Sequence, residues 1–358
     1  MLLDETTVRP YARGCAVLGG GGGGDPGIAL EAALHEIGLH GPVAVLDVDE
    51  VPDDGIIMPC ALVGAPTVVA EKLWNGDEAL WLRDQLEEVT GKRVRALMVA
   101  EIGGVNGVMP VACAARLGLP LVDADGMGRA YPHVNQMALH LRGVSGTPCV
   151  VVDVHGNVVV LLTTDNQWLD TVIRSVVAAC GGLCVAALYP MGVAEMRDAA
   201  LRGSVSRALR IGAAADGALD DPIVAVCDEA GATELIRGRI VDVERRTSGG
   251  AVHGSFVTVD VDDPAGRMVR VEFQHENLVA LSEGAVLVTA PDVITVLDAH
   301  TGAAISNERL RYGQRVAVIA FPCDEVWRTG AGLRLGGPAA FGLDVPYVPV
   351  EEGVRAAS

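Results

Sequence analysis

Residues 13–40 read RGCAVLGGGGGGDPGIALEAALHEIGLH, and this stretch decides the fold that the sequence predicts. The apolar run at 13–18 indicates a buried strand, and six glycines follow it directly. Asp25 is a good N-cap residue and Pro26 suits the first helical position, so a helix is expected from there to a stop at Gly41. A strand, a glycine loop and a capped helix are typical of an α/β layer structure.

Strand and helix patterns alternate outward from this stretch. The predicted strands and helices are strand 42–51, helix 66–90, strand 93–104, helix 107–118, strand 119–128, hairpin 147–164 and helix 166–180. After residue 195 the pattern predicts one amphipathic helix at 194–212 and then segments of period 2. We therefore expect an α/β N-terminal domain at 1–178, a sheet with helices. A helix followed by a mainly-β C-terminal domain should occupy 179–358.

Charge and composition narrow the class of protein. The net charge of −19 argues against a nucleic-acid partner, because an acidic surface repels phosphates. Residues 175–194 carry no charge and reach the length of a membrane span, but Gly181, Gly182 and Pro190 interrupt them. Eight scattered cysteines suit a reducing compartment. We expect a cytoplasmic protein that binds a small molecule and does not enter a membrane. The sequence leaves open whether the protein forms a homo-oligomer.

The glycine loop is the strongest local signal for a ligand. Between a strand and a helix, its backbone N–H groups and the helix N-terminus would suit an anion or a polarised carbonyl. A tight turn with close packing is the alternative. The pattern is neither GxGxxG with a distant acid nor GxxxxGK[ST], so it does not indicate a nucleotide. The predicted substrate-binding residues in this stretch are Gly20, Gly21, Gly22, Gly23, Gly24 and Asp25.

Acidic residues follow two of the predicted strands. Glu101 precedes Gly103, Gly104 and Asn106, where an α/β sheet places ligand-binding groups. Asp123 and Asp125 alternate on a strand and would share one face, as catalytic acid and base or as ligands of a divalent metal such as zinc. Arg129 would neutralise them or hold a substrate carboxylate. The alternative is that Asp125 caps a turn and pairs with Arg129.

Two further polar positions are candidates. His133 lies eight residues after Asp125 and could join Asp123 and Asp125 as a metal ligand, although it forms no tight metal-binding motif. Glu276 belongs to a run of four polar residues, 274–277, that interrupts a strand and would face a site, a domain interface or a loop edge. With Glu101, Asp123, Asp125 and Arg129 as the catalytic candidates, Asn106 and Glu276 complete the predicted substrate-binding set.

An ordered set of motifs resembles one known family along nearly the whole chain. The motifs are GGGGGGDP, MPCALVGAPTV, EIGGVNG, DADGMGRAYP, GSVSRA, FQHENL, APDVI, RYGQRVAVIA and GGPAAFG. They resemble the S-methyl thiohydantoin desulfurase family, formerly a domain of unknown function, DUF917. Two positions depart from that pattern, His133 where an acid is expected and His275 where Asn is expected, so the substrate of this chain could differ.

The resemblance implies an α/β domain, a β-rich domain and hydrolysis of an S-methylated thiohydantoin to a hydantoin and a thiol. Such a reaction needs an activated water, help for the leaving thiolate and donors for the ring oxygen. A non-catalytic small-molecule-binding or accessory subunit of a hydantoinase system is the competing interpretation. An isomerase or a ring-opening amidohydrolase is a third.

Overall fold

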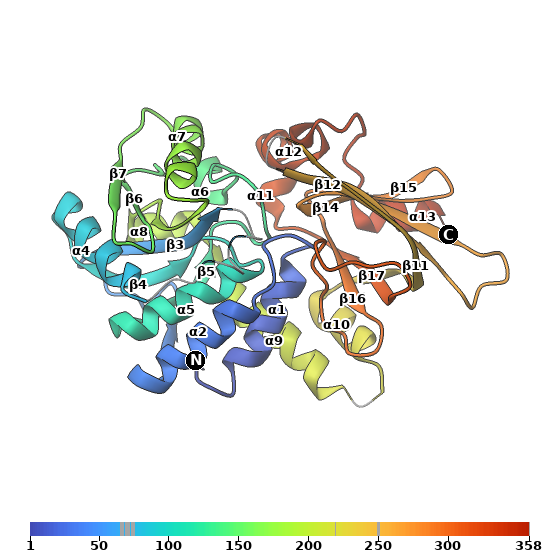
Figure 1. Cartoon of the computed structure of the whole chain (residues 1–358), viewed down its shortest axis with the longest axis horizontal. Helices are drawn as coiled ribbons and strands as arrows, with labels where there is room; N and C mark the ends of the chain where they lie inside the picture. The colour runs from blue at the N-terminus through green and yellow to red at the C-terminus, as the bar shows by residue number, and fades with distance from the viewer. Residues whose placement is uncertain (65–67, 69–71, 73–75, 219, 249–250, 358) are drawn as a thin grey trace.

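The first part of the chain is built on a mixed sheet that helices cover on both faces (Figure 1). This computed structural model describes residues 1–64, 68, 72, 76–218, 220–248 and 251–357. The strand order is β1 (Leu2–Leu3), β2 (Val43–Leu46), β5 (Leu121–Asp125), β4 (Val94–Val99), β3 (Ile56–Gly64), β8 (Leu183–Ala187), β6 (Cys149–Val152) and β7 (Val158–Leu161). The neighbours β2, β5, β4 and β3 run parallel, so their carboxyl ends lie at one edge.

The two faces of this sheet contact different helices. In β4, Leu97 and Val99 face one hydrophobic core, whereas Ala96 and Met98 face the other, as a period of 2 requires. The helices on the first face are α1 (Val8–Leu18), α2 (Gly27–His40), α4 (Glu78–Thr90), α5 (Val105–Leu117) and α9 (Ser204–Gly217). Those on the second face are α6 (Ala138–Leu141), α7 (Asn166–Ala179) and α8 (Val193–Ala199).

The second part of the chain forms an antiparallel sheet that curls on itself. Its order is β15 (Ala285–Thr289), β14 (Glu276–Ser282), β13 (Met268–Gln274), β12 (Ala251–Val259), β11 (Thr233–Ser248), β17 (Arg315–Phe321) and β16 (Val293–Asp298). Phe256, Val271 and Ile294 lie in its core. The short helix α10 (Pro222–Ala230) precedes this sheet; α11 (Glu325–Arg328), α12 (Gly330–Gly336), the 3-10 turn η1 (Pro338–Phe341) and α13 (Val350–Ala357) follow it.

The predicted fold class is confirmed, an α/β layer followed by mainly-β structure. The sheets, however, divide later in the chain than the predicted boundary after residue 178. Strand β8 pairs with β3 and β6, and two short strands, β9 (Met191–Gly192) and β10 (Leu201–Arg202), pair with β3 and β5. Residues 183–202 therefore complete the first sheet, and the boundary between the sheets lies after Arg202.

The predicted strand at 13–18 is wrong, because these residues end α1. The buried residues Val8, Tyr11, Ala12, Cys15 and Leu18 follow a helical spacing that begins upstream of the apolar run. The glycine loop therefore joins two helices. The single helix predicted at 194–212 is also interrupted, since Gly203 has a φ of 75° and separates β10 from α9.

The uncharged stretch at 175–194 forms the end of α7, a turn at Gly181 and Gly182, and the buried strand β8. In the described part of the chain, no helix has both the length and the apolar character needed to span a membrane. The predicted helix 66–90 is confirmed for Glu78–Thr90, whereas most of residues 65–75 lie outside the described residues.

Candidate functional site at the glycine loop

The glycine loop lies where the two sheets meet. Its carbonyl groups accept hydrogen bonds from both parts of the chain: Gly20 from the amide of Asn277 (2.8 Å), Gly21 from that of Asn307 (2.9 Å) and Gly23 from that of Val105 (2.9 Å). The first two donors belong to the β half, and the third begins α5. The loop is thus part of the interface between the halves.

Several loop amides have no hydrogen-bond acceptor among the described residues. Gly22 donates to the carbonyl of Gly19 (3.0 Å), but the amides of Gly21, Gly23 and Gly24 donate no hydrogen bond to any described residue. Gly21, Gly22 and Gly24 also line a groove of about 940 Å³. The loop therefore borders a cavity, as the sequence led us to expect. Its role in substrate binding stays a prediction.

Only glycine fits at the centre of the loop. A β-carbon on Gly22 would lie 2.3 Å from Oε1 of Glu276, and one on Gly21 would lie 2.6 Å from Nδ2 of Asn277. Gly21 also has a φ of 86°, which favours glycine. The loop backbone therefore lies in direct contact with the side chains of Glu276 and Asn277.

Four buried side chains contact the loop, and each has an atom without a hydrogen-bond partner in the part of the chain that the structure describes. We call Arg129, Glu276, Asn277 and Asn307 the junction cluster. The unpaired atoms are Nη2 of Arg129, Oε2 of Glu276, Oδ1 of Asn277 and Oδ1 of Asn307. None of these residues is more than 3% exposed. Buried polar atoms are nearly always hydrogen-bonded, so unpaired ones gathered around a single loop indicate a place for water or ligand.

Glu101 is a second buried carboxyl group at this junction. Nδ2 of Asn106, on α5, donates to its Oε2 at 2.7 Å, and the same side chain bonds the backbone of Leu62 in β3. Burial raises the pKa of Glu101 to about 8; Asn106 opposes this, and the charges of Glu276 and Asp125 add to it. The predicted residue Asn106 thus positions Glu101.

Glu276 has a similar environment but a different neighbour. Burial raises its pKa to about 7, and the positive charge of Arg129 opposes this rise. Two carboxyl groups within electrostatic reach, both with pKa values raised by burial, are suited to acid and base roles near neutral pH.

Asp125 is held by backbone amides. Its Oδ2 accepts hydrogen bonds from Gly128 (2.7 Å), Met127 (2.9 Å) and Ile102 (3.1 Å), and these amides oppose the burial that raises its pKa to about 6. Asp125 therefore joins the end of β5 to the segment that carries Glu101. This geometry resembles the turn-capping alternative more than that of an exposed catalytic acid.

Asp123 lies against α9. Its Oδ1 accepts a hydrogen bond from the amide of Ser206 (2.9 Å), and its carbonyl accepts one from Gly203 (2.8 Å). The convergence that the sequence predicted therefore brings Asp125 and Glu101 together, whereas Asp123 caps a helix.

His133 is engaged elsewhere. Its Nδ1 lies 2.9 Å from Oδ2 of Asp170 and 2.8 Å from Nη2 of Arg174. Among the described residues, no three His, Cys, Asp or Glu side chains are placed so that they could hold a metal ion. The structure thus does not assemble the predicted set of Asp123, Asp125 and His133, and a bound zinc stays a prediction.

The side chain of Arg129 bridges the two halves through carbonyl groups. Its Nη1 donates to Pro291 (2.5 Å) and Asp292 (3.2 Å), and its guanidinium lies 4.7 Å from the ring centre of Tyr131. The alternative of an ion pair with Asp125 is wrong, since Arg129 pairs with no carboxylate in the described part of the chain.

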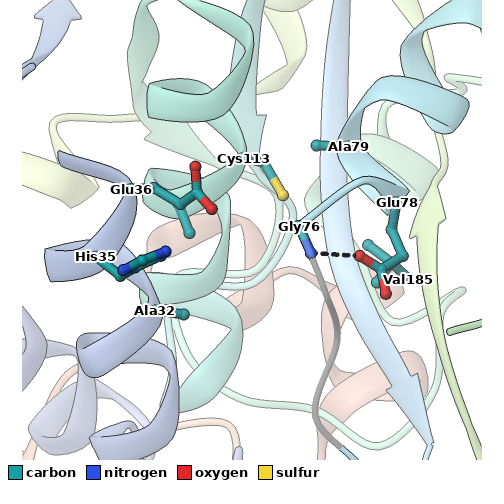
Figure 2. Close-up of a pocket in the computed structure, with 9 residues that line it drawn as sticks. Ala32, His35, Glu36, Gly76, Glu78, Ala79, Cys113 and Val185 are labelled. Atoms are coloured by element: carbon teal, nitrogen blue, oxygen red, sulfur yellow. Dashed lines mark hydrogen bonds between the residues drawn. The ribbon is translucent and has the colours of Figure 1, made fainter. Parts of the chain in front are cut away.

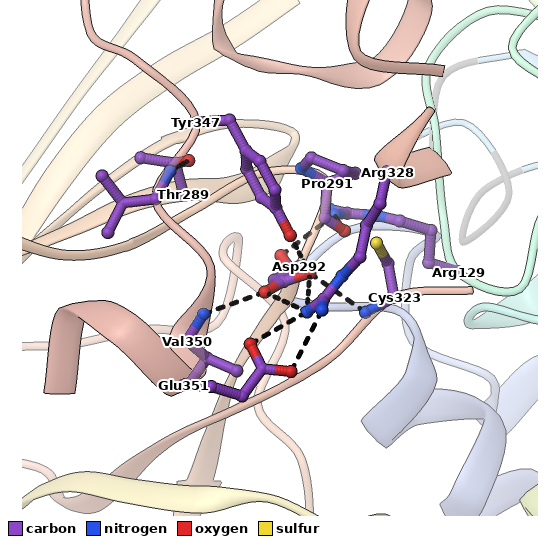
Figure 3. A network of polar contacts seen from close by, with 10 residues as sticks. Arg129, Thr289, Pro291, Asp292, Cys323, Arg328, Tyr347, Val350 and Glu351 are labelled. Atoms are coloured by element: carbon purple, nitrogen blue, oxygen red, sulfur yellow. Dashed lines mark hydrogen bonds and ion pairs between the residues drawn. The ribbon is translucent and has the colours of Figure 1, made fainter. Parts of the chain in front are cut away.

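Pro291 and Asp292 belong to a buried network (Figure 3). The carboxylate of Asp292 accepts hydrogen bonds from Arg328 (2.9 Å), Tyr347 (3.0 Å) and the amide of Val350 (3.0 Å). These partners come from α11 and from the chain that leads into α13. The network therefore fixes the C-terminal segment and the carbonyl groups that hold Arg129.

A smaller cavity of about 90 Å³ lies between α2, α4, α5 and β8 (Figure 2). Glu36, Glu78, His35 and Cys113 line it, and the amide of Gly76 donates to Glu78 at 2.8 Å. No motif in the sequence indicates this cavity, because its residues belong to separate segments.

These features define a two-sheet protein with a polar site buried where the sheets meet. Two family models match it, the S-Me-THD-like N-terminal domain over residues 6–163 and the S-Me-THD-like C-terminal domain over residues 164–350. The chain belongs to the S-methyl thiohydantoin desulfurase-like family, as its motifs indicated.

A solved structure extends the comparison to the whole chain. The X-ray crystal structure of a protein from Chromobacterium violaceum matches with a TM-score of 0.78 and 27% sequence identity. The match covers 98% of this chain and 100% of that one. Among curated proteins, none matches this chain.

Proposed function

We propose that this protein is a hydrolase that acts on a small cyclic ureide-like substrate. The reaction would cleave the C–S bond of an S-alkylated thiohydantoin to give a hydantoin and a thiol. The observation that carries the proposal is the junction cluster, where buried polar atoms and loop amides without partners among the described residues lie together. Its carboxyl group, Glu276, and the nearby Glu101 both have raised pKa values. Family membership supports the same class of reaction.

Each proton transfer of the proposed hydrolysis is assigned to a residue with a suitable protonation state. With a pKa of about 7, Glu276 is available as a carboxylate that takes a proton from water as the water oxygen bonds to the ring carbon bearing sulfur. With a pKa of about 8, Glu101 keeps a proton that it can give to the leaving sulfur as the C–S bond breaks. The proton on Glu276 then returns to Glu101, and the new hydroxyl loses its proton to the ring nitrogen.

Other residues would bind and orient the substrate. The free amides of Gly21 and Gly23 are suited to hold a ring carbonyl oxygen, the role of an oxyanion hole. The unpaired oxygens of Asn277 and Asn307 are acceptors for ring N–H groups. In this proposal Asp125 positions the Glu101 segment and Asp123 has no chemical role.

The test is release of methanethiol from an S-methyl thiohydantoin by the purified protein. Glu276→Gln and Glu101→Gln should each lower kcat at least about 100-fold, the usual contribution of a general acid or base. Glu272→Gln, a more exposed position in the same sheet, is the matched control and should keep wild-type activity. Rates should rise with pH near the pKa of Glu276, about 7, and fall near that of Glu101, about 8.

Full activity in both glutamine variants would refute the assignment of these residues. Wild-type protein that binds a hydantoin but converts no cyclic ureide would refute hydrolysis. The non-catalytic binding or accessory role would then be the better description.

A further inference from the structure

The groove in front of the glycine loop has a charge pattern that the proposed reaction does not use. Both halves of the chain contribute arginines to its wall: Arg9 and Arg13 on α1, and Arg309 and Arg311 in the segment between β16 and β17. On a chain with a net charge of −19, a groove lined by four arginines is a local exception. Its volume of about 940 Å³ is within the range of small-molecule sites.

The three aspartates in the same wall are already engaged. Asp216 pairs with Arg13 at 2.6 Å, and Asp25 pairs with Arg309. Oδ1 of Asp298 accepts hydrogen bonds from the amides of His300 and Thr301 in its own turn. Two cationic side chains of the wall, Arg9 and Arg311, therefore remain exposed, with no carboxylate partner among the described residues.

The floor of the groove also favours a negative group. The amide of Gly24, which the proposed reaction does not use, has no partner in the described part of the chain, and Gly24 lines the groove. Pro26 and Gly27, at the start of the 14-residue helix α2, line it as well. The carboxylate of Asp25 already accepts a hydrogen bond from the amide of Gly27 at the start of α2 (2.8 Å), so the positive field of the groove comes from its arginines and the amide of Gly24.

From this geometry we infer that the groove binds the carboxylate group of a small organic acid. The inference deepens the proposed function and rests on it in one respect, the identity of that acid. A ring bound at the junction cluster would extend its side arm past Gly21 and Gly22 into the groove. The substrates would then be cyclic ureides with an acidic side arm. The guanidinium groups of Arg9 and Arg311 suit such a carboxylate.

The first arm of the test measures binding without turnover. Calorimetric titration of the full chain with succinate should show saturable binding, and the uncharged succinamide should not bind. The double variant Arg9→Gln, Arg311→Gln should bind succinate about tenfold more weakly or worse. The control Arg93→Gln, Arg246→Gln removes two exposed charges elsewhere and should bind as the wild type does. Absence of succinate binding, or equal affinity in all three proteins, would overturn the inference.

The second arm measures selectivity on S-methyl thiohydantoins with a carboxylate side arm or its amide. The Arg9→Gln, Arg311→Gln variant should raise KM for the acidic substrate about tenfold, with little change in kcat or in KM for the amide. Equal KM for both substrates in the wild type would overturn the selectivity. Succinate binding without thiol release from either substrate would instead refute the hydrolase and leave the anion groove standing.

Discussion

Glu276 illustrates at the scale of one residue how burial sets the chemistry of the site. It is 3% exposed, contacts Gly22 and has one oxygen without a partner. In the folded protein its pKa is about 7, against an ordinary value of 4.5. The folded state therefore binds more protons than the unfolded state between those two values, so the free energy of unfolding falls as pH rises through them.

This raised pKa predicts a pH-dependent gain of stability in Glu276→Gln. Below about pH 4.5 Glu276 is protonated in both the folded and the unfolded state, so its raised pKa does not lower the free energy of unfolding. Above pH 7 the residue is charged in both states, and the destabilisation is complete. Between pH 5 and pH 8 the variant should gain up to about 3 kcal/mol of unfolding free energy relative to the wild type. Urea unfolding across this range measures the difference, with Glu272→Gln as the control. A constant difference would contradict the raised pKa.

The sequence singled out many of the residues at this site, but not their roles. Glu101, Asn106, Arg129 and Glu276 were identified because polar residues interrupt or follow apolar strands. Asn307 was not, since it lies in a polar segment without a pattern and reaches the loop only through the tertiary fold. The metal hypothesis for His133 relied on proximity in sequence, whereas its side chain contacts Asp170 and Arg174.

At the scale of elements, the error over residues 13–18 has a clear cause. A short apolar run is compatible with a strand or with one turn of a buried helix, and only the spacing from Val8 onward distinguishes them. Helices α1 and α9 pack so closely that a β-carbon on Gly14 would lie 1.7 Å from the carbonyl oxygen of Ala208 in α9. This contact between distant segments is invisible in a local pattern.

The contact between β5 and α9 makes Asp123 a helix cap supplied by a strand. Asp123→Ala should lower the unfolding free energy by about 1 kcal/mol, the usual cost of losing a cap, because the amide of Ser206 loses its acceptor. Asp123→Asn keeps an oxygen acceptor and should cost less. Thermal unfolding and the thiol-release assay together test this expectation. Loss of turnover in Asp123→Asn at unchanged stability would restore Asp123 to the active site.

At the scale of the whole molecule, the network around Asp292 connects the C-terminal helix to the interface. Asp292→Ala would leave Arg328 without its buried partner, and removing one member of such a pair usually costs about 3–5 kcal/mol. We expect amide hydrogens of α13 to exchange much faster in this variant. Glu351→Gln weakens only the more exposed contact of Arg328 and should change exchange little. Unchanged protection in Asp292→Ala would show that α13 is held by other contacts.

The late strands of the first sheet have a consequence for synthesis. Strand β3 is complete by Gly64, yet its neighbour β8 begins only at Leu183, more than a hundred residues later. During synthesis, the apolar edges of β3 and β6 that pair with β8 stay unpaired until β8 has left the ribosome. Unpaired edges of this kind invite pairing with other chains. We therefore expect newly made protein to be more prone to aggregation before residue 187 has emerged than after it.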